Sequence, residues 1–187
     1  MPFLLFARRF ALPQARMLHP KTTERKTKRE SKRGKTVRDR YRHVFAALDG
    51  KSSMPAVVKR AAIIARADHA KLTLGHIVDS APYERAHARI DYASLCEDAR
   101  ARILGELNRH VAADLRSADI EDVSLVVRAG PVIPTLHDLI SQELHPDLVV
   151  CGKRGLSGIE HALSRSVSAH LVRHLRCDVL VVESEST

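Results

Sequence analysis

Two short segments of the sequence carry residue types that suit the binding of a phosphorylated ligand. The first is Asp49-Gly50, which ends a run of apolar residues. The second is the glycine-bearing segment 152–158, which also contains Lys153 and Arg154. Glycines allow backbone N–H groups to approach an anion closely, and the two cations add positive charge. The second segment therefore predicts a loop that holds phosphate groups.

A helix is expected to begin near Arg165, shortly after this loop. Its N-terminal amides and partial positive charge would favour an anion, and the hydroxyl groups of Ser166 and Ser168 can donate further hydrogen bonds. Asp49, across the expected crevice from this loop, would accept hydrogen bonds from a ribose or hold a metal ion. A glycine turn that only closes a strand–helix unit, with a surface aspartate opposite, is equally compatible with these residues.

The elements that must position these residues alternate along the chain. Strands are expected at 43–48, 72–78, 123–127, 148–151 and 179–182, and helices at about 53–67, 84–115, around 136–140 and 165–175. Ser53 is expected to cap the first helix. Strands that are apolar at nearly every position are typical of a parallel sheet covered by helices on both faces. In such sheets ligands bind where two neighbouring crossovers leave in opposite directions.

Four segments, in the same order, resemble those of the universal stress protein family, and the similarity covers residues 43–187. They are Val44–Gly50, Leu72–Asp79, Asp147–Gly155, and Ser166–Ser168 followed by Cys177–Val182. The resemblance implies a Rossmann-like α/β fold, a doubly wound five-stranded parallel sheet of order 3-2-1-4-5. It also implies homodimers joined through the last strand, Val179–Val182, and a role in stress endurance.

One branch of this family binds ATP through the pattern G-x-x-G, nine residues, and then G-[S/T]. Gly152, Gly155 and Ser166 fill three of the four positions, but Arg165 replaces the last glycine. Its side chain either blocks the ligand or pairs with a phosphate. Replacing Arg165 with Gly would strengthen nucleotide binding in the first case and weaken it in the second.

The resemblance also implies contacts to an adenine nucleotide, with Mg²⁺ as its counter-ion. Asp49 would meet the ribose, and Ile77 the adenine through its backbone. Val167 and Ser168 would bind the phosphates through their amides. We therefore expect a protein that binds ATP or a related nucleotide as a stress-response sensor or switch. Any hydrolysis should be slow, because no general base and no Walker-type lysine motif is visible.

Two other functions are compatible with this sequence. The second branch of the family has lost the glycines and does not bind ATP, so the chain is alternatively a dimeric stress protein that acts through protein partners. A nucleotide hydrolase or transferase on the same fold is a further alternative. It predicts release of phosphate that Asp49→Ala would abolish.

The positive charge of the chain is concentrated in residues 1–42. The 187 residues have a formal net charge of +9, and residues 1–42 hold 14 of the 31 Lys plus Arg but three of the 22 Asp plus Glu. The rest is mildly acidic, and its aromatic residues are Phe45, Tyr83 and Tyr92, too few to stack nucleic-acid bases. Residues 1–42 are expected to be disordered. They are either an arm that binds nucleic acid or acidic lipid, or a non-structural extension, and residues 1–18 resemble an organelle presequence in composition.

Cysteines and hydropathy indicate a cytoplasmic domain. Cys96, Cys151 and Cys177 have no C-x-x-C spacing, which argues against a disulfide framework or a zinc site. The longest apolar run is about strand length, well short of the roughly 20 residues that cross a bilayer. Cys151 lies beside the phosphate loop and is either a redox sensor or a small buried side chain.

Histidines are numerous but form no metal-binding pattern. His170 and His174 are four residues apart, and no third ligand has a spacing tied to them, so a solvated helix face is expected. His76 lies within an expected strand. It is interpreted as a core or edge histidine with one hydrogen-bond partner.

Overall fold

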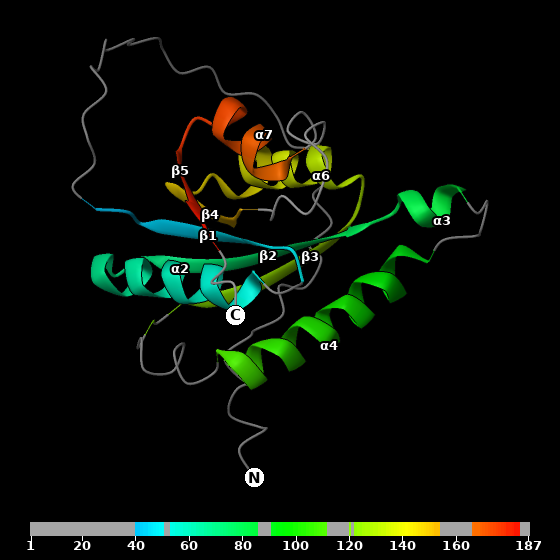
Figure 1. The fold of residues 1–187 in the computed structure, drawn as a ribbon, viewed down its shortest axis with the longest axis horizontal. Coiled ribbons are helices and arrows are strands. Elements are labelled where there is room, and N and C mark those ends of the chain that lie inside the picture. The colour runs from blue at the N-terminus through cyan, green and yellow to red at the C-terminus, as the bar shows by residue number, and fades with distance from the viewer. Residues whose placement is uncertain are drawn as a thin grey trace, which may run out of the picture. The chain divides into compact units, whose positions relative to one another are not determined.

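A five-stranded parallel sheet forms the centre of the computed structural model, which describes residues 40–50, 53–85, 91–111, 120, 122–153 and 166–183 (Figure 1). The strand order is β3-β2-β1-β4-β5. The strands are β1 (His43–Leu48), β2 (Lys71–Asp79), β3 (Val123–Gly130), β4 (Leu148–Gly152) and β5 (Asp178–Val182). The expected fold class and strand order are confirmed.

Helices cover both faces of the sheet. They are α2 (Met54–Asp68), α3 (Ala81–Arg85), α4 (Tyr92–His110), α6 (Val132–Asp138), the π-helical turn η1 (Leu139–Leu144) and α7 (Val167–His174). Figure 1 shows α2 and α4 on one face and α6 and α7 on the other. Three consecutive residues of β1, Val44, Phe45 and Ala46, are all 0% exposed. Because successive side chains of a strand point to opposite faces, β1 is buried on both faces of the sheet.

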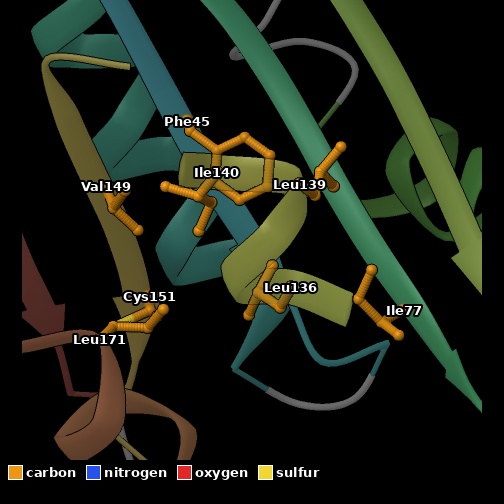
Figure 2. Packing of buried hydrophobic residues seen from close by; sticks show 8 residues of the cluster. All are labelled: Phe45, Ile77, Leu136, Leu139, Ile140, Val149, Cys151 and Leu171. Carbon is orange, nitrogen blue, oxygen red and sulfur yellow. The ribbon is translucent and has the colours of Figure 1, made fainter. Parts of the chain in front are cut away.

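The core between the sheet and α6, η1 and α7 is a single apolar cluster. Figure 2 shows its buried members, which are Phe45, Ile77, Leu136, Leu139, Ile140, Val149, Cys151 and Leu171. Three strands and both helices of this face contribute to it. The cluster therefore fixes the short helix α7 against the central strands.

The single long helix expected over 84–115 is wrong. Helix α3 ends at Arg85, and α4 begins after Asp91, whose backbone is extended (φ −93°, ψ 91°). The Asp91 carboxylate accepts hydrogen bonds from the amides of Ala93 (3.0 Å) and Ser94 (3.2 Å). This side-chain cap satisfies two amides that a continuous helix would bond internally, so a new helix starts here.

The helix that follows β3 changes its hydrogen-bond pattern before it ends. Residues 139–144 form a π-helical turn, and the amide of His145 donates to the Ile140 carbonyl at 2.9 Å. His145 adopts a left-handed conformation (φ 47°) directly before Pro146. This confirms the expected stop before His145-Pro146.

The β3 strand continues to Gly130, three residues beyond its expected end, because Arg128, Ala129 and Gly130 pair with β2.

No helix in the described ranges is long and apolar enough to cross a membrane. The described elements belong to one unit, Tyr41–Thr187. Apart from residues 40–42, the expected N-terminal extension lies outside the described residues.

A polar chain crosses three strands on the η1 side of the sheet. His43 Nε2 lies 2.9 Å from Thr73 Oγ1, which lies 3.1 Å from Ser124 Oγ. Burial, together with the nearby Lys71 ammonium, lowers the pKa of His43. The folded chain therefore binds a proton at His43 less readily than the unfolded chain does.

We expect the free energy of unfolding to fall as the pH falls from about 7 to 5. The unfolded state takes up more protons in this range, because the pKa of His43 is lower in the folded state than the ordinary value. His43→Gln keeps a hydrogen-bonding group that does not titrate, so the free energy of unfolding of this variant should fall less between the two pH values. Urea denaturation at both pH values measures this, with the exposed His110→Gln as control. Equal slopes for wild type and His43→Gln would contradict it.

Candidate functional site

The ends of β1 and β4 lie side by side at one edge of the sheet. The two strands are parallel neighbours, and their register pairs Ala47 with Cys151. Asp49 and Gly152 therefore follow this pair at the same, carboxyl edge. The helix after β1 covers one face of the sheet and the helix after β4 covers the other (Figure 1). This is the position at which doubly wound sheets bind ligands.

Ser53 connects the two strand ends. Its Oγ donates a hydrogen bond to Asp49 Oδ2 at 2.8 Å. A Cβ added to Gly152 would lie 2.5 Å from the same Oγ, so Gly152 and Ser53 are in close contact. Ser53 occupies the N-cap position of α2 as expected, but the expectation that it caps is wrong, because its hydroxyl is bonded to Asp49 and to no helix amide. Sequence reasoning missed this contact, for which the one-turn spacing of Asp49 and Ser53 was the available signal.

Gly50 makes the turn that directs the chain away from β1. Its φ of +69° lies in the left-handed region that favours glycine. A Cβ there would also lie 3.2 Å from His76 Cε1. The His76 ring is buried, and its Nδ1 lies 2.9 Å from the carbonyl oxygen of Leu48. The interpretation of His76 as a core histidine with one hydrogen-bond partner is confirmed.

Lys153 directly follows β4, beside the end of β5, and its side chain forms an ion pair with Glu183. Its amide donates to the Val182 carbonyl at 2.7 Å, and its Nζ lies 2.9 Å from Glu183 Oε1. The hydrogen bond from Lys153 lowers the pKa of Glu183. The ammonium group thus already has a carboxylate partner. Arg154, Gly155 and Arg165 lie outside the described residues.

The start of α7 is formed by Ser166, Val167 and Ser168. Ser166 has an extended backbone at the N-cap position, and its hydroxyl lies 2.9 Å from that of Ser168. Its side chain caps no amide of α7. The first amides of a helix have no partner within the helix, so the start of α7 offers N–H donors to an anion.

The apolar cluster holds the start of α7 close to the end of β4. Val167 packs against the cluster that contains Cys151, the residue before Gly152. Cys151 and Leu171 of α7 belong to this same cluster (Figure 2). The fold therefore places the N-terminal amides of α7 near the carboxyl edge of the sheet.

Ile77 lies just beyond the end of β1. The last β1–β2 pair is Leu48 with His76, whereas Ile77 pairs with Arg128 of β3. The Ile77 side chain is buried in the apolar cluster (Figure 2). Its backbone is therefore at the same carboxyl edge as Asp49.

Cys151 is a buried core residue. Its side chain is 3% exposed, and burial raises the pKa of its thiol to about 11. A thiol of this kind stays protonated near neutral pH and is a poor nucleophile. The structure therefore favours the small buried side chain over the redox sensor.

No disulfide joins Cys96, Cys151 or Cys177. Within the described part of the chain, no group of three or more His, Cys, Asp or Glu residues is arranged to hold a metal ion.

Comparison with known proteins identifies the class to which this fold and these strand ends belong. The model of the universal stress protein family matches residues 40–183, and the chain belongs to that family. A Staphylococcus aureus (strain USA300) protein, named as a candidate universal stress protein, is 28% identical over 145 residues, which are 78% of this chain and 86% of the relative.

Two solved structures illustrate the similarity. A universal stress protein in complex with cAMP is 28% identical, with a TM-score of 0.54, and the match covers 79% of this chain and 100% of that one. A universal stress protein from Lactobacillus plantarum is 23% identical, with a TM-score of 0.59, and the match covers 78% and 99% of the two chains. The second comparison supports the fold alone.

Proposed function

We propose that this protein binds ATP or a related adenine nucleotide at the carboxyl ends of β1 and β4, as a sensor or switch in the stress response. The observation that carries this proposal is the contact of Ser53 with both Asp49 and Gly152, at the edge where the crossovers diverge. A family member 28% identical to this chain has been solved with cAMP, which is an adenine nucleotide.

Each part of the site has a chemical role in this proposal. Asp49 accepts hydrogen bonds from the ribose, and Gly152 lets the backbone approach the ligand closely. The amides of Val167 and Ser168 bind the phosphates, aided by the partial positive charge of the helix start. The backbone of Ile77 meets the adenine.

Five further residues complete the phosphate side of the proposed site. They are Lys153, Arg154, Gly155, Arg165 and Ser166, and Mg²⁺ accompanies the phosphates as a counter-ion. Little or no hydrolysis is proposed, because Asp49 already accepts a hydrogen bond from Ser53 and serves the ribose. A phosphate-release assay distinguishes this proposal from the hydrolase alternative.

Titration with a fluorescent ATP analogue tests the proposed binding. The wild type should give a saturable signal below millimolar ligand. Asp49→Asn should weaken binding by about 10-fold or more, because hydrogen bonds to a charged acceptor contribute about 1.5–3 kcal/mol. The control Asp98→Asn removes an exposed carboxylate on α4 and should bind like the wild type. No saturable signal at millimolar ligand would contradict the proposal and favour the dimeric scaffold that acts through protein partners.

We also propose that two copies pair through β5 in a reducing cytoplasm. This strand is at the end of the sheet, and Val181 is 37% exposed. Pairing would satisfy the backbone groups of the edge and cover Val179–Val182. Sedimentation should show a dimer at micromolar concentration, and Val181→Lys should shift it toward monomer. A monomeric wild type at high micromolar concentration would overturn this part of the proposal.

A further inference from the structure

Three histidine rings lie in a row where α6 meets α7. The ring centroids of His137 and His170 are 5.4 Å apart in an edge-on arrangement with an interplanar angle of 78°. Those of His170 and His174 are 4.2 Å apart and stacked, with an angle of 20°. The solvated face expected for His170 and His174 is wrong for His170, which is partly buried. No spacing in the sequence indicated that His137 joins them from another helix.

Within the described residues, no acidic group neutralises this row of rings. Two buried ring nitrogens, His137 Nδ1 and His170 Nε2, have no hydrogen-bond partner there. His174 Nδ1 lies 2.9 Å from the carbonyl oxygen of His170, and His137 Nε2 lies 3.5 Å from Ser141 Oγ. Burial and then the charges of His174 and His137 lower the pKa of His170.

The other titratable or charged groups on the elements around α7 are exposed, apart from the half-buried Cys177. They are Asp138 on α6, Glu143 on η1, Arg173 on α7, Arg176 and Cys177 after it, and Asp178 on β5. None of these is among the groups that shift the pKa of His170. Glu143 pairs with Arg128, and Asp178 accepts a hydrogen bond from the Tyr41 hydroxyl. Protonation of neighbouring rings would therefore create a repulsion that no acidic group of the described residues offsets.

The docking of α7 depends on few contacts. The helix has eight residues, and Leu171 is its one fully buried side chain. Val167 and Leu175 pack partly against the same apolar cluster. A short helix held by one buried side chain is easily displaced by repulsion between stacked rings, because local opening costs least where few apolar groups are buried.

We propose that His137, His170 and His174 form a pH-sensitive contact that holds α7 against α6 when the rings are neutral and releases it in mild acid. Release is expected between about pH 6.5 and 5, where histidine titrates. The start of α7 carries Val167 and Ser168, so release also weakens nucleotide binding. This second consequence rests on the proposed function.

Hydrogen exchange with mass spectrometry tests the release without any nucleotide. Protection of residues 167–174 is compared with that of α2 at about pH 7.5 and 5.5, after correction for the intrinsic exchange rates. In the wild type, α7 should lose at least about 10-fold more protection than α2 in acid. His170→Phe keeps a ring of similar size that does not ionise, so this extra loss should disappear. The control variant His110→Phe, on α4, should still show the extra loss of protection in α7.

Equal losses of protection in α7 and α2, or an unchanged loss in His170→Phe, would overturn the proposal. An NMR titration of the imidazole Cε1–H signals provides a second test if a variant folds poorly. Coupled titration is expected, with the pKa of His170 below its ordinary value, whereas three independent ordinary titrations would overturn the proposal.

The link to nucleotide binding has its own measurement. Affinity for a fluorescent ATP analogue should fall more steeply between about pH 7.5 and 5.5 in the wild type than in His170→Phe. Equal pH dependence would overturn this link. Because the exchange and NMR experiments use the protein alone, a failure to bind nucleotide does not affect their outcome.

Discussion

Gly75→Ala is expected to lower the free energy of unfolding by about 3 kcal/mol, near the upper end of typical overpacking costs. A Cβ at this position would overlap the Cζ and Cε2 atoms of the Phe45 ring. Phe45 is 0% exposed and belongs to the same apolar cluster as Leu139, Ile140 and Val149 (Figure 2). Because this cluster is closely packed, the ring cannot move without displacing its neighbours.

Gly105→Ala is the matched control, because it adds the same methyl group to a helix where, apart from the adjacent residues and the helix backbone, no described heavy atom lies within 4 Å of the new Cβ. It should raise the free energy of unfolding by about 0.5–1 kcal/mol, since glycine is the poorer helix former. Urea denaturation of both variants measures the contrast. Phe45→Leu added to Gly75→Ala should recover part of the lost stability. Two variants of equal stability would contradict the explanation.

Gly152→Ala is expected to weaken binding of a fluorescent ATP analogue by about 10-fold or more, which corresponds to about 1.4 kcal/mol. The new Cβ would lie 2.5 Å from Ser53 Oγ and 2.9 Å from Ser53 Cβ. Ser53 must therefore shift, and its hydrogen bond to Asp49 is disturbed. In the proposed site, the methyl group would also hinder the close approach of this backbone to the ligand.

A double-mutant cycle separates these two effects. Ser53→Gly removes the side chain that the new methyl group would meet, and glycine is tolerated at an N-cap. If displacement of Ser53 dominates, Gly152→Ala should cost much less affinity in the Ser53→Gly background than in the wild type. Equal losses in both backgrounds would show that the methyl group acts on the ligand directly. An unchanged affinity in Gly152→Ala itself would place the ligand elsewhere.

The apolar strands and their flanking turns made most of the fold predictable. Val44, Phe45 and Ala46 are consecutive apolar residues, a pattern that requires a cover on both faces and so indicates a parallel sheet. The break between α3 and α4 was harder to predict, because the apolar pattern continues through it. It depends on the carboxylate of Asp91 binding two backbone amides, which is a local contact that hydrophobic periodicity does not report.

The candidate site was predictable in part for the same reason. Asp49 and Gly152 each end an apolar strand, and the carboxyl ends of neighbouring parallel strands meet at one edge. The role of Ser53 was not predictable, because serine before a helix normally caps the helix. Only the packed structure shows its hydroxyl turned toward Asp49.

By itself, the sequence determined which residues form strands, that the sheet is parallel and which two strand ends carry polar chemistry, because these follow from local patterns of apolar and turn residues. The tertiary structure alone decided that Ser53 touches both Asp49 and Gly152, that Lys153 pairs with Glu183, and that His137 meets His170. Most of these contacts join residues far apart in the chain. Their geometry depends on how helices pack on the sheet, and periodicity along the chain carries no information about it.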